Sequence, residues 1–237
     1  MEGVKLGIAL PLVSTKVHSG FLDTFILLKK PDFVYLRPQF PSMEIDIIRN
    51  QLVKQALEAG CTHLLMMDTD QTYSDRDMIL KMLAHKKKVI SAIVHRRYPP
   101  FDCITLRGEP GKYTQVSDEE ILAARDSDNH LVEIDATGCG CLLYNTEVFQ
   151  EIKPPWYEFS KTESGDVVGE DIGFCHKLKD AGYNIYCDVS IDIGHLAQLE
   201  INWGTYALYK HLKKLQAAEA KKEIEAEVEK EETIKEE

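Results

Sequence analysis

The sequence of 237 residues lacks any long apolar run, since no stretch approaches the ~18–20 consecutive apolar residues of a membrane-spanning helix. Its beginning, MEGVKLGIALPLV, is unlike a secretory signal, because Glu2 is acidic and Gly7 and Pro11 interrupt the apolar segment. These two absences predict a cytoplasmic protein without an integral membrane segment.

The sequence also lacks a long basic run: acidic residues outnumber basic ones by 39 to 28, which gives a formal net charge of −11, and the one basic run, Lys86-Lys87-Lys88, is short. Proteins that bind nucleic acid usually carry a positive patch that neutralises phosphates. We therefore expect no nucleic-acid partner.

Six cysteines are present, but their spacing gives no metal-binding pattern. Cys139-Gly140-Cys141 is the only close pair, and neither a second pair nor a nearby histidine completes the four ligands of a structural zinc site. Most of the cysteines lie inside apolar runs, where a reduced thiol behaves as a small hydrophobe. The sequence therefore predicts buried free thiols and a reducing compartment.

The first hundred residues contain an alternation of short apolar runs and helical patterns. We expect strands at residues 4–13, 33–36, 63–67 and 89–94, and helices at residues 42–60 and 74–85. Ser42 is the expected N-cap of the first helix, and Gly60 suits the position just after its end. Continuous apolar strands that follow helices are typical of parallel sheets covered on both faces. The pattern predicts an α/β protein with a Rossmann-like, mostly parallel central sheet and helices on both faces.

The second half of the chain has a less regular pattern. Residues 99–132 are interpreted as an insertion or hairpin region with a polar helix at 118–125. A strand at 133–144, a helix at 170–181 and a strand at 183–189 follow. We expect a single domain at residues 1–212. Residues 213–237 are nearly all Ala, Glu, Lys and Ile after Leu215, and form a charged helical or disordered tail.

The strongest chemical signal is Asp68-Thr69-Asp70, which follows the apolar run 63–67. Open α/β sheets bind ligands at the carboxyl ends of their strands. Two close carboxylates repel each other unless a cation joins them, and their hard oxygens suit Mg²⁺ or Mn²⁺. An ordinary loop turn explains the same residues, so this motif alone leaves both interpretations open.

A second pair of acids, Glu170 and Asp171, opens the helix expected at 170–181. Asp171 lies three residues before Phe174 and therefore points toward the same inner side. The helix N-terminus favours an ionised carboxylate, which can act as a general base. Helix capping is the alternative role, because acids are common in first turns.

Arg49 and His195 are two further candidates. Arg49 falls in the middle of the apolar stripe of the helix at 42–60, and a buried guanidinium needs an anionic partner. That partner is either a carboxylate of Asp68-Thr69-Asp70 or a nucleotide phosphate. His195 follows Gly194 after the last expected strand, where either ring nitrogen can approach a metal.

The order of these features resembles the GT-A glycosyltransferases, and most closely the family-2-like group that includes small phage and archaeal members. A strand ending in Asp-Thr-Asp, Gly-Glu-Asp opening a helix about a hundred residues later and a downstream Gly-His carry the likeness, which spans residues 4–200. Three further phrases also look like that group, namely Arg49-Asn50-Gln51-Leu52-Val53, the run TGCGCLL at 137–143 and Pro155-Trp156-Tyr157.

The resemblance implies a metal-dependent transfer of a sugar from a UDP- or GDP-linked donor to an unidentified hydroxyl on a sugar, lipid or protein. Asp70 would ligate Mn²⁺ or Mg²⁺, Asp68 would lie beside the metal and the ribose, and His195 would be the third protein contact to the metal. Asp171 would be the base if the reaction inverts the anomeric centre, with Glu170 beside it. Such an ion would stabilise the leaving nucleoside diphosphate.

The remaining expectations concern donor and acceptor contacts. Arg49 and Pro11 join Asp68 on the donor side, although Pro11 lacks the aromatic neighbour of the family's Pro-x-Tyr-Asn-like segment, so the base stays unassigned. Trp156 is expected either to stack on an acceptor sugar or to be a core residue. Residues 96–132 and 154–165 are the expected acceptor loops.

Three alternative functions share parts of the pattern. Asp68-Thr69-Asp70-Gln71-Thr72 also fits the nucleophile motif of haloacid dehalogenase-like phosphatases, but that motif normally follows the first strand, whereas two expected strands precede it here. A sugar nucleotidyltransferase should have a Gly-rich basic loop after the first strand, and residues 14–20 do not supply one. A non-catalytic module that binds a nucleotide-sugar is the third alternative.

Overall fold

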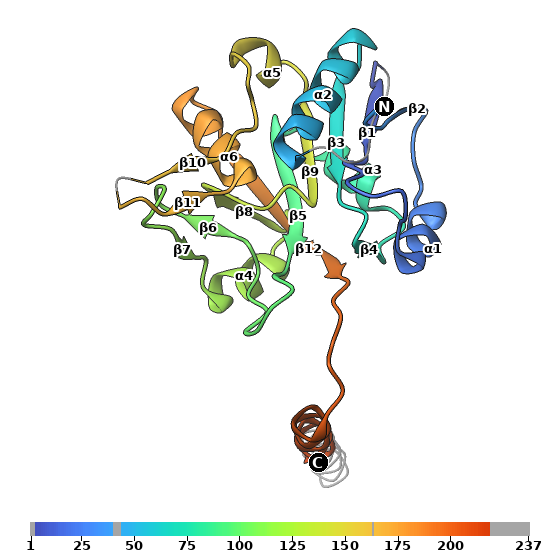
Figure 1. Ribbon diagram of the computed structural model, residues 1–237, viewed down its shortest axis with the longest axis vertical. Helices are drawn as coiled ribbons and strands as arrows, with labels where there is room; N and C mark the ends of the chain where they lie inside the picture. Colours follow the sequence, from blue (N-terminus) through green and yellow to red (C-terminus); the bar gives the residue numbers. More distant parts are fainter. Residues whose placement is uncertain (1–2, 40–43, 163, 219–237) are drawn as a thin grey trace, which may run out of the picture. The chain divides into compact units, whose positions relative to one another are not determined.

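The computed structural model describes residues 3–39, 44–162 and 164–218 (Figure 1). The chain divides into two compact units, Met1–Leu196 and Ala197–Glu237. This division lies before residue 212, the domain end expected from composition.

The first unit is built on an eight-stranded sheet in the order β2-β1-β3-β9-β5-β12-β4, with β8 also paired to β12. Its strands are β1 (Leu6–Ala9), β2 (Phe33–Leu36), β3 (His63–Met67), β4 (Gln71–Tyr73), β5 (Val89–Val94), β8 (Leu131–Ile134), β9 (Cys141–Asn145) and β12 (Ile185–His195). Within this sheet β1, β2, β3, β5 and β12 share one direction, and β4, β8 and β9 run the opposite way. The expected mostly parallel sheet is confirmed, with antiparallel β9 between β3 and β5.

Strand β12 is long enough to pair with two strands along its outer side. Its first half pairs with β8, and its second half pairs with β4. An irregularity between Asp188 and Asp192 shifts its register against β5. A bulge of this kind re-aims the residues that follow it, and here those residues lead to His195.

Helices cover both faces of the sheet. They are α1 (Ser19–Leu27), α2 (Ile45–Glu58), α3 (Met78–Ala84), α4 (Asp118–Arg125), α5 (Val148–Glu151) and α6 (Glu170–Asp180). Side chains of β3 alternate between two core clusters: Leu64 and Met66 pack with α2 and α6, whereas Leu65 and Met67 pack with α1 and α3. The period-two alternation of a strand buries both sets, which explains the continuous apolar run in the sequence.

Two small hairpins lie outside the main sheet. They are β6 (Leu106–Arg107) with β7 (Thr114–Gln115), and β10 (Ser160–Lys161) with β11 (Val167–Val168). Between β7 and β8, Ser117 caps α4 by accepting a hydrogen bond from the backbone N–H of Glu120. The expected hairpin region with a polar helix at 118–125 is therefore confirmed.

Several expected boundaries were wrong, each for a local reason. The helix expected at 74–85 begins only at Met78, because β4 ends at Tyr73 and a turn follows in which Asp75 accepts hydrogen bonds from the backbone N–H groups of Asp77 and Met78. The strand expected at 133–144 is two strands, β8 and β9, separated by a buried glycine-containing turn. Helix α1 was not expected, and the proposed N-cap Ser42 lies outside the described residues. Gly60 does follow α2 with a positive φ of 64°, as expected.

In the second unit, residues 203–218 are helical. The rings of Trp203 and Tyr206 lie in contact there, with centroids 5.3 Å apart. Most of the charged tail expected at 213–237 lies outside the described residues. Among the residues described, no helix is both long and apolar enough to cross a membrane.

Candidate active site

The acidic motif lies where β3 ends, at the edge of the sheet that also receives the ends of β5 and β12. These strands share one direction, so their carboxyl ends meet at the same edge. Asp68 follows Met67 directly, and His195 is the last residue of β12. A backbone hydrogen bond of 2.8 Å from Leu196 N–H to the carbonyl of Asp70 fixes the two segments side by side. The structure therefore brings Asp68, Asp70 and His195 to one edge of the sheet.

Asp70 and His195 face each other across this edge. Nε2 of His195 lies 3.5 Å from Oδ2 of Asp70, and Nδ1 lies 2.7 Å from the carbonyl of His95. Burial alone would lower the pKa of His195, but the hydrogen bonds to Asp70 and to the His95 carbonyl raise it. Burial would likewise raise the pKa of Asp70, yet His195 and Arg97 lower it. The two side chains thus stabilise each other's charged form.

Arg97 was not among the residues singled out from the sequence. Its Nη1 donates to Oδ2 of Asp70 at 2.8 Å, on the same oxygen that faces His195. Arg97 lies three residues after the end of β5, so the rule that selected Asp68 also applies to it. Its sequence position alone does not indicate a role in the site, because an arginine in a loop is usually solvated.

Arg49 is buried and pairs with two acids. Nη2 donates to Oδ1 of Asp68 at 3.2 Å, and Nη1 donates to Oε1 of Glu170. The side chain of Arg49 is 5% exposed and that of Glu170 is 8% exposed. Burial opposes the charge of Arg49, but the surrounding acidic groups raise its pKa well above the ordinary value. Of the two partners expected for this arginine, the structure provides carboxylates.

Glu170 and Asp171 take different places although they are neighbours. Glu170 is buried, and burial raises its pKa although Arg49 opposes the increase. Asp171 is half-buried, and its Oδ1 accepts a 2.8 Å hydrogen bond from the backbone N–H of Ile172. Its Oδ2 has no hydrogen-bond partner in the described chain and lies near Gly138. Asp171 therefore assists the helix start and keeps one oxygen available.

The two other sequence-predicted contact residues, Pro11 and Trp156, have different surroundings. Pro11 is buried and follows the carboxyl end of β1, which lies at the same edge of the sheet as the end of β3. Trp156 is 4% exposed, and its indole N–H donates to the carbonyls of Phe149 at 3.1 Å and Ile152 at 2.8 Å. Its ring packs edge-to-face on Phe149. Of the two roles expected for Trp156, the structure provides the core role, because its ring and its N–H are both used in the core.

The glycine-rich segment before β9 supports the acidic motif. The carbonyl of Gly140 accepts a 2.9 Å hydrogen bond from the backbone N–H of Asp68 and another from the Tyr73 hydroxyl. A Cβ at Gly140 would lie 2.0 Å from Nε2 of the buried Gln71. The Tyr73 hydroxyl shares its single proton between the Gly140 carbonyl, at 3.1 Å, and that of Asp68, at 2.9 Å. The contact with Gln71 explains why glycine occupies position 140. Tyr73 and Gln71 are two supporting residues that the sequence pattern did not reveal.

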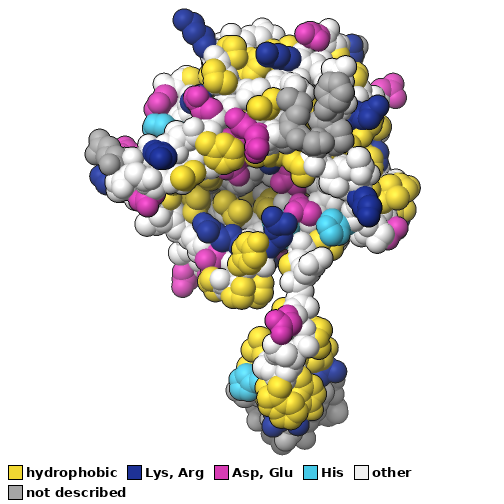
Figure 2. Space-filling view, in the orientation of Figure 1, with side chains coloured by type: hydrophobic (Ala, Val, Ile, Leu, Met, Phe, Trp, Pro, Cys, Tyr) yellow, Lys and Arg dark blue, Asp and Glu magenta, His cyan; other side chains and the backbone are white. Residues whose placement is uncertain are grey.

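Two cavities lie on the side of the domain that carries His195 and the start of α6. The face of the domain turned toward the viewer in Figure 2 is hollowed, and acidic and basic side chains gather around the hollow. A cavity of about 460 Å³ is lined by His95, Arg96 and His195, and one of about 310 Å³ is lined by Arg96, Tyr113 and Gly169. Arg96 thus lies between the His195 side and the start of α6.

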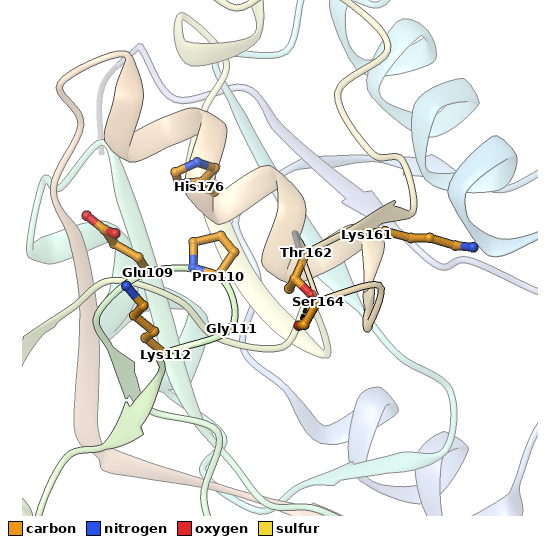
Figure 3. A pocket seen from close by; sticks show the side chains of 8 residues that line it. All are labelled: Glu109, Pro110, Gly111, Lys112, Lys161, Thr162, Ser164 and His176. Atoms are coloured by element: carbon orange, nitrogen blue, oxygen red, sulfur yellow. Dashed lines mark hydrogen bonds between the residues drawn. The ribbon is translucent and has the colours of Figure 1, made fainter.

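A further cavity, of about 520 Å³, lies between the two small hairpins. Figure 3 shows that the β6–β7 turn, including Pro110 and Lys112, forms one side, that Thr162 and Ser164 of the other hairpin lie opposite, and that His176 of α6 completes the wall. Both of the loops expected to contact an acceptor contribute to this cavity.

Asp70 and His195 present one oxygen and one nitrogen that fit a divalent cation. Because a carbonyl only accepts, Nδ1 of His195 carries a proton, and in the neutral ring Nε2 keeps the lone pair that a metal requires. Two ligand atoms bound to one ion at about 2.1 Å lie about 3–3.5 Å apart, which agrees with the Asp70 to His195 separation. Asp68 faces Arg49 instead, and no cluster of three or more His, Cys, Asp or Glu arranged for a metal occurs among the described residues. The fit thus rests on Asp70 and His195.

Comparison with known proteins gives no matching family model and no matching curated sequence. Among solved structures, GalNAc-T7, crystallised with UDP, GalNAc and Mn²⁺, superposes with a TM-score of 0.53 and 10% identity, over 83% of this chain and 44% of that one. A197 from STIV gives a TM-score of 0.49 at 13% identity, over 84% of this chain and 99% of that one. S. aureus TarS 1–349 with UDP-GlcNAc gives 0.43 at 12% identity, over 84% and 60%.

The chain has the GT-A fold. In this chain Asp68 follows β3, the third strand, and not the first strand. The expectation that two strands precede the motif is confirmed, and the phosphatase alternative, whose motif normally follows a first strand, loses its structural basis.

Proposed function

We propose that this protein is a divalent-cation-dependent glycosyltransferase that moves a sugar from a nucleoside-diphosphate donor to a hydroxyl acceptor. The observation that carries the proposal is the meeting of Asp70 Oδ2 and His195 Nε2 at the carboxyl edge of the sheet, with a separation of 3.5 Å. The GT-A fold and a similar structure crystallised with UDP and Mn²⁺ support it.

Asp70 and His195 are the residues that would hold the cation. When bound, Mn²⁺ or Mg²⁺ supplies positive charge that stabilises the leaving nucleoside diphosphate. The His95 carbonyl orients the His195 ring by accepting from Nδ1. Pro11, at the end of β1, and Asp68 lie on the donor side of the proposed site.

Arg49 takes a positioning role in this scheme in place of a phosphate contact. Its guanidinium joins Asp68, at the end of β3, to Glu170, at the start of α6. Both of its Nη atoms are engaged with carboxylates, so an incoming phosphate would have to break a buried ion pair. Glu170 is consequently the partner of Arg49, and it fixes the first turn of α6 beneath Asp171.

Asp171 is the proposed base for an inverting reaction. Its Oδ2 would accept the proton of the acceptor hydroxyl. At the same time the oxygen of that hydroxyl would form a bond to the anomeric carbon of the donor sugar, and the bond from this carbon to the phosphate oxygen would break. The cavity of about 310 Å³ beside Gly169 and the cavity between the hairpins provide space on this side. Acceptor recognition is therefore assigned to these hairpins and not to Trp156.

The function is tested by measuring release of nucleoside diphosphate from UDP- and GDP-linked sugars with Mn²⁺ and with EDTA. We expect turnover with Mn²⁺ only, and loss of at least about 100-fold in Asp70→Asn and His195→Ala. Asp77→Asn is the matched control, because Asp77 is a surface acid that pairs with Lys29.

Other outcomes separate the alternatives. Turnover of a generic phosphomonoester that disappears in Asp68→Asn would support the phosphatase instead. Thermal stabilisation by a nucleotide-sugar with Mn²⁺ but without any turnover would support the binding module. No stabilisation by any nucleotide-sugar would contradict the proposal.

A further inference from the structure

One carboxylate oxygen in the proposed cation site already has a cationic partner from the protein itself. Oδ2 of Asp70 accepts from Nη1 of Arg97 at 2.8 Å and lies 3.5 Å from Nε2 of His195. The same atom therefore serves the guanidinium and faces the histidine. A cation bound by Asp70 and His195 would share this oxygen with Arg97 or displace it.

We propose that Arg97 competes with the cation for Asp70. Its guanidinium stays paired with Asp70 until the diphosphate of a donor gives it another anionic partner. Cation and donor would then bind cooperatively. The diphosphate would draw Arg97 away from Asp70, and the cation, by binding Asp70, would free Arg97 for the diphosphate. This inference rests on the proposed function, and it concerns the order in which the site is filled.

The permanent positive charge of Arg97 makes it an effective competitor for Asp70. A guanidinium does not lose its proton at any physiological pH, so only a competing anion or a change of side-chain conformation releases Asp70. A divalent cation beside a retained guanidinium would meet like-charge repulsion. A diphosphate is a favourable competitor, since arginine binds phosphate oxygens through two parallel hydrogen bonds.

The surroundings of Arg97 allow it to move. Its side chain is 45% exposed, whereas that of Asp70 is 27% exposed. Ion pairs between partly exposed groups contribute little net free energy, so the contact can be exchanged at small cost. The buried pair of Arg49 and Glu170 lacks this freedom, because both side chains are less than 10% exposed.

Arg96 provides a matched control on the same loop. It carries the same charge and lines the cavity beside His195, but its guanidinium has no hydrogen bond or ion pair among the residues that the structure describes. A general effect of positive charge would appear in both variants. A specific hold on Asp70 would appear only when Arg97 is changed.

The test is calorimetric titration of Mn²⁺ into wild type, Arg97→Ala and Arg96→Ala without nucleotide, with circular dichroism to verify folding. We expect Arg97→Ala to bind Mn²⁺ about three- to tenfold more tightly than wild type and Arg96→Ala to change by less than about twofold. In the second arm, UDP and GDP are titrated with saturating Mn²⁺ and with EDTA. For the nucleotide that binds, Mn²⁺ should strengthen binding at least about fivefold in wild type and clearly less in Arg97→Ala.

Each contrary result has a distinct meaning. Three results would overturn the proposal that Arg97 competes for Asp70. They are equal Mn²⁺ affinity in wild type and Arg97→Ala, an equal gain of Mn²⁺ affinity in Arg97→Ala and Arg96→Ala, and absence of Mn²⁺ binding in all three proteins. If the first arm behaves as expected but neither nucleotide binds, the hold on Asp70 stands while release by a diphosphate and the proposed function both fail.

Discussion

Arg49 and Glu170 form a buried ion pair although 121 positions separate them in the sequence. One lies on α2 and the other opens α6, so the pair joins the two helices that pack on one face of the sheet. The other Nη of Arg49 reaches Asp68. A single guanidinium thus sets the positions of both acidic motifs recognised in the sequence.

Removing this guanidinium should strongly destabilise the domain. Arg49→Met leaves buried Glu170 and half-buried Asp68 without their counter-charge, and an unpaired buried charge typically costs about 3–5 kcal/mol. Urea denaturation followed by circular dichroism measures the loss. Because apolar replacement of both partners removes the uncompensated charge, the double variant Arg49→Met/Glu170→Met should be more stable than Arg49→Met.

The surface pair Lys29 with Asp77 is the reference for that experiment. Lys29→Met removes an exposed salt bridge and should cost less than about 1 kcal/mol. If Arg49→Met is no more destabilised than Lys29→Met, the guanidinium does not hold the motifs together.

The thiols should be almost inert in the folded protein. Cys103 is half-buried, and the other five cysteines are buried. Burial raises the pKa of Cys139 to about 11 and that of Cys187 to about 12, so these groups stay protonated at pH 8 and are poor nucleophiles. Titration with a chromogenic disulfide at pH 8 should show one reactive thiol in the native protein and six in denaturant. The single native thiol should disappear in Cys103→Ser, and a second fast equivalent would contradict the packing described.

Trp156 gives a way to separate a core role from sugar recognition. Trp156→Phe removes the indole N–H and leaves the carbonyls of Phe149 and Ile152 without that donor, so the free energy of unfolding should fall by about 1–3 kcal/mol. Donor turnover at a temperature where the variant is folded should stay near the wild-type rate. Trp203→Phe, at an 80% exposed position, is the control and should leave stability unchanged. A raised KM for an acceptor with unchanged stability would restore the stacking role.

The sequence predicted the parts of this molecule that depend on local pattern. Continuous apolar runs indicated β3 and β5 with their observed bounds, because strands buried on both faces consist mostly of apolar residues. The run at 33–36 also matches β2, although Phe33 and Tyr35 of this edge strand are exposed. The place of Asp68 at the sheet edge followed from its position directly after β3. Arg49 was recognised because a charged residue inside an apolar stripe contradicts the helical pattern around it.

The parts that were missed depend on contacts between distant segments. Residues 71–73 are a strand only because β12 returns beside them, and the bulge in β12 has no signature in composition. The strand expected at 133–144 is divided by a turn whose residues 136–140 are themselves buried, so exposure does not distinguish this turn from the strands on either side. The hold of Arg97 on Asp70 joins residues 27 positions apart, and nothing in an exposed arginine indicates which carboxylate it will meet.

The assignment of Asp171 as base, and of Glu170 as a positioning residue, is tested by two amide substitutions. Asp171→Asn keeps an oxygen that can accept from the Ile172 N–H but cannot take a proton, so kcat for nucleoside diphosphate release should fall about 100- to 10,000-fold while Mn²⁺ and nucleotide affinities are retained. Glu170→Gln should instead mainly lower stability, because Arg49 loses a buried counter-charge. Asp180→Asn, at the other end of α6, is the matched control and should leave both properties unchanged. Unchanged kcat in Asp171→Asn, or an equal loss of kcat in a well-folded Glu170→Gln, would reject this division of roles.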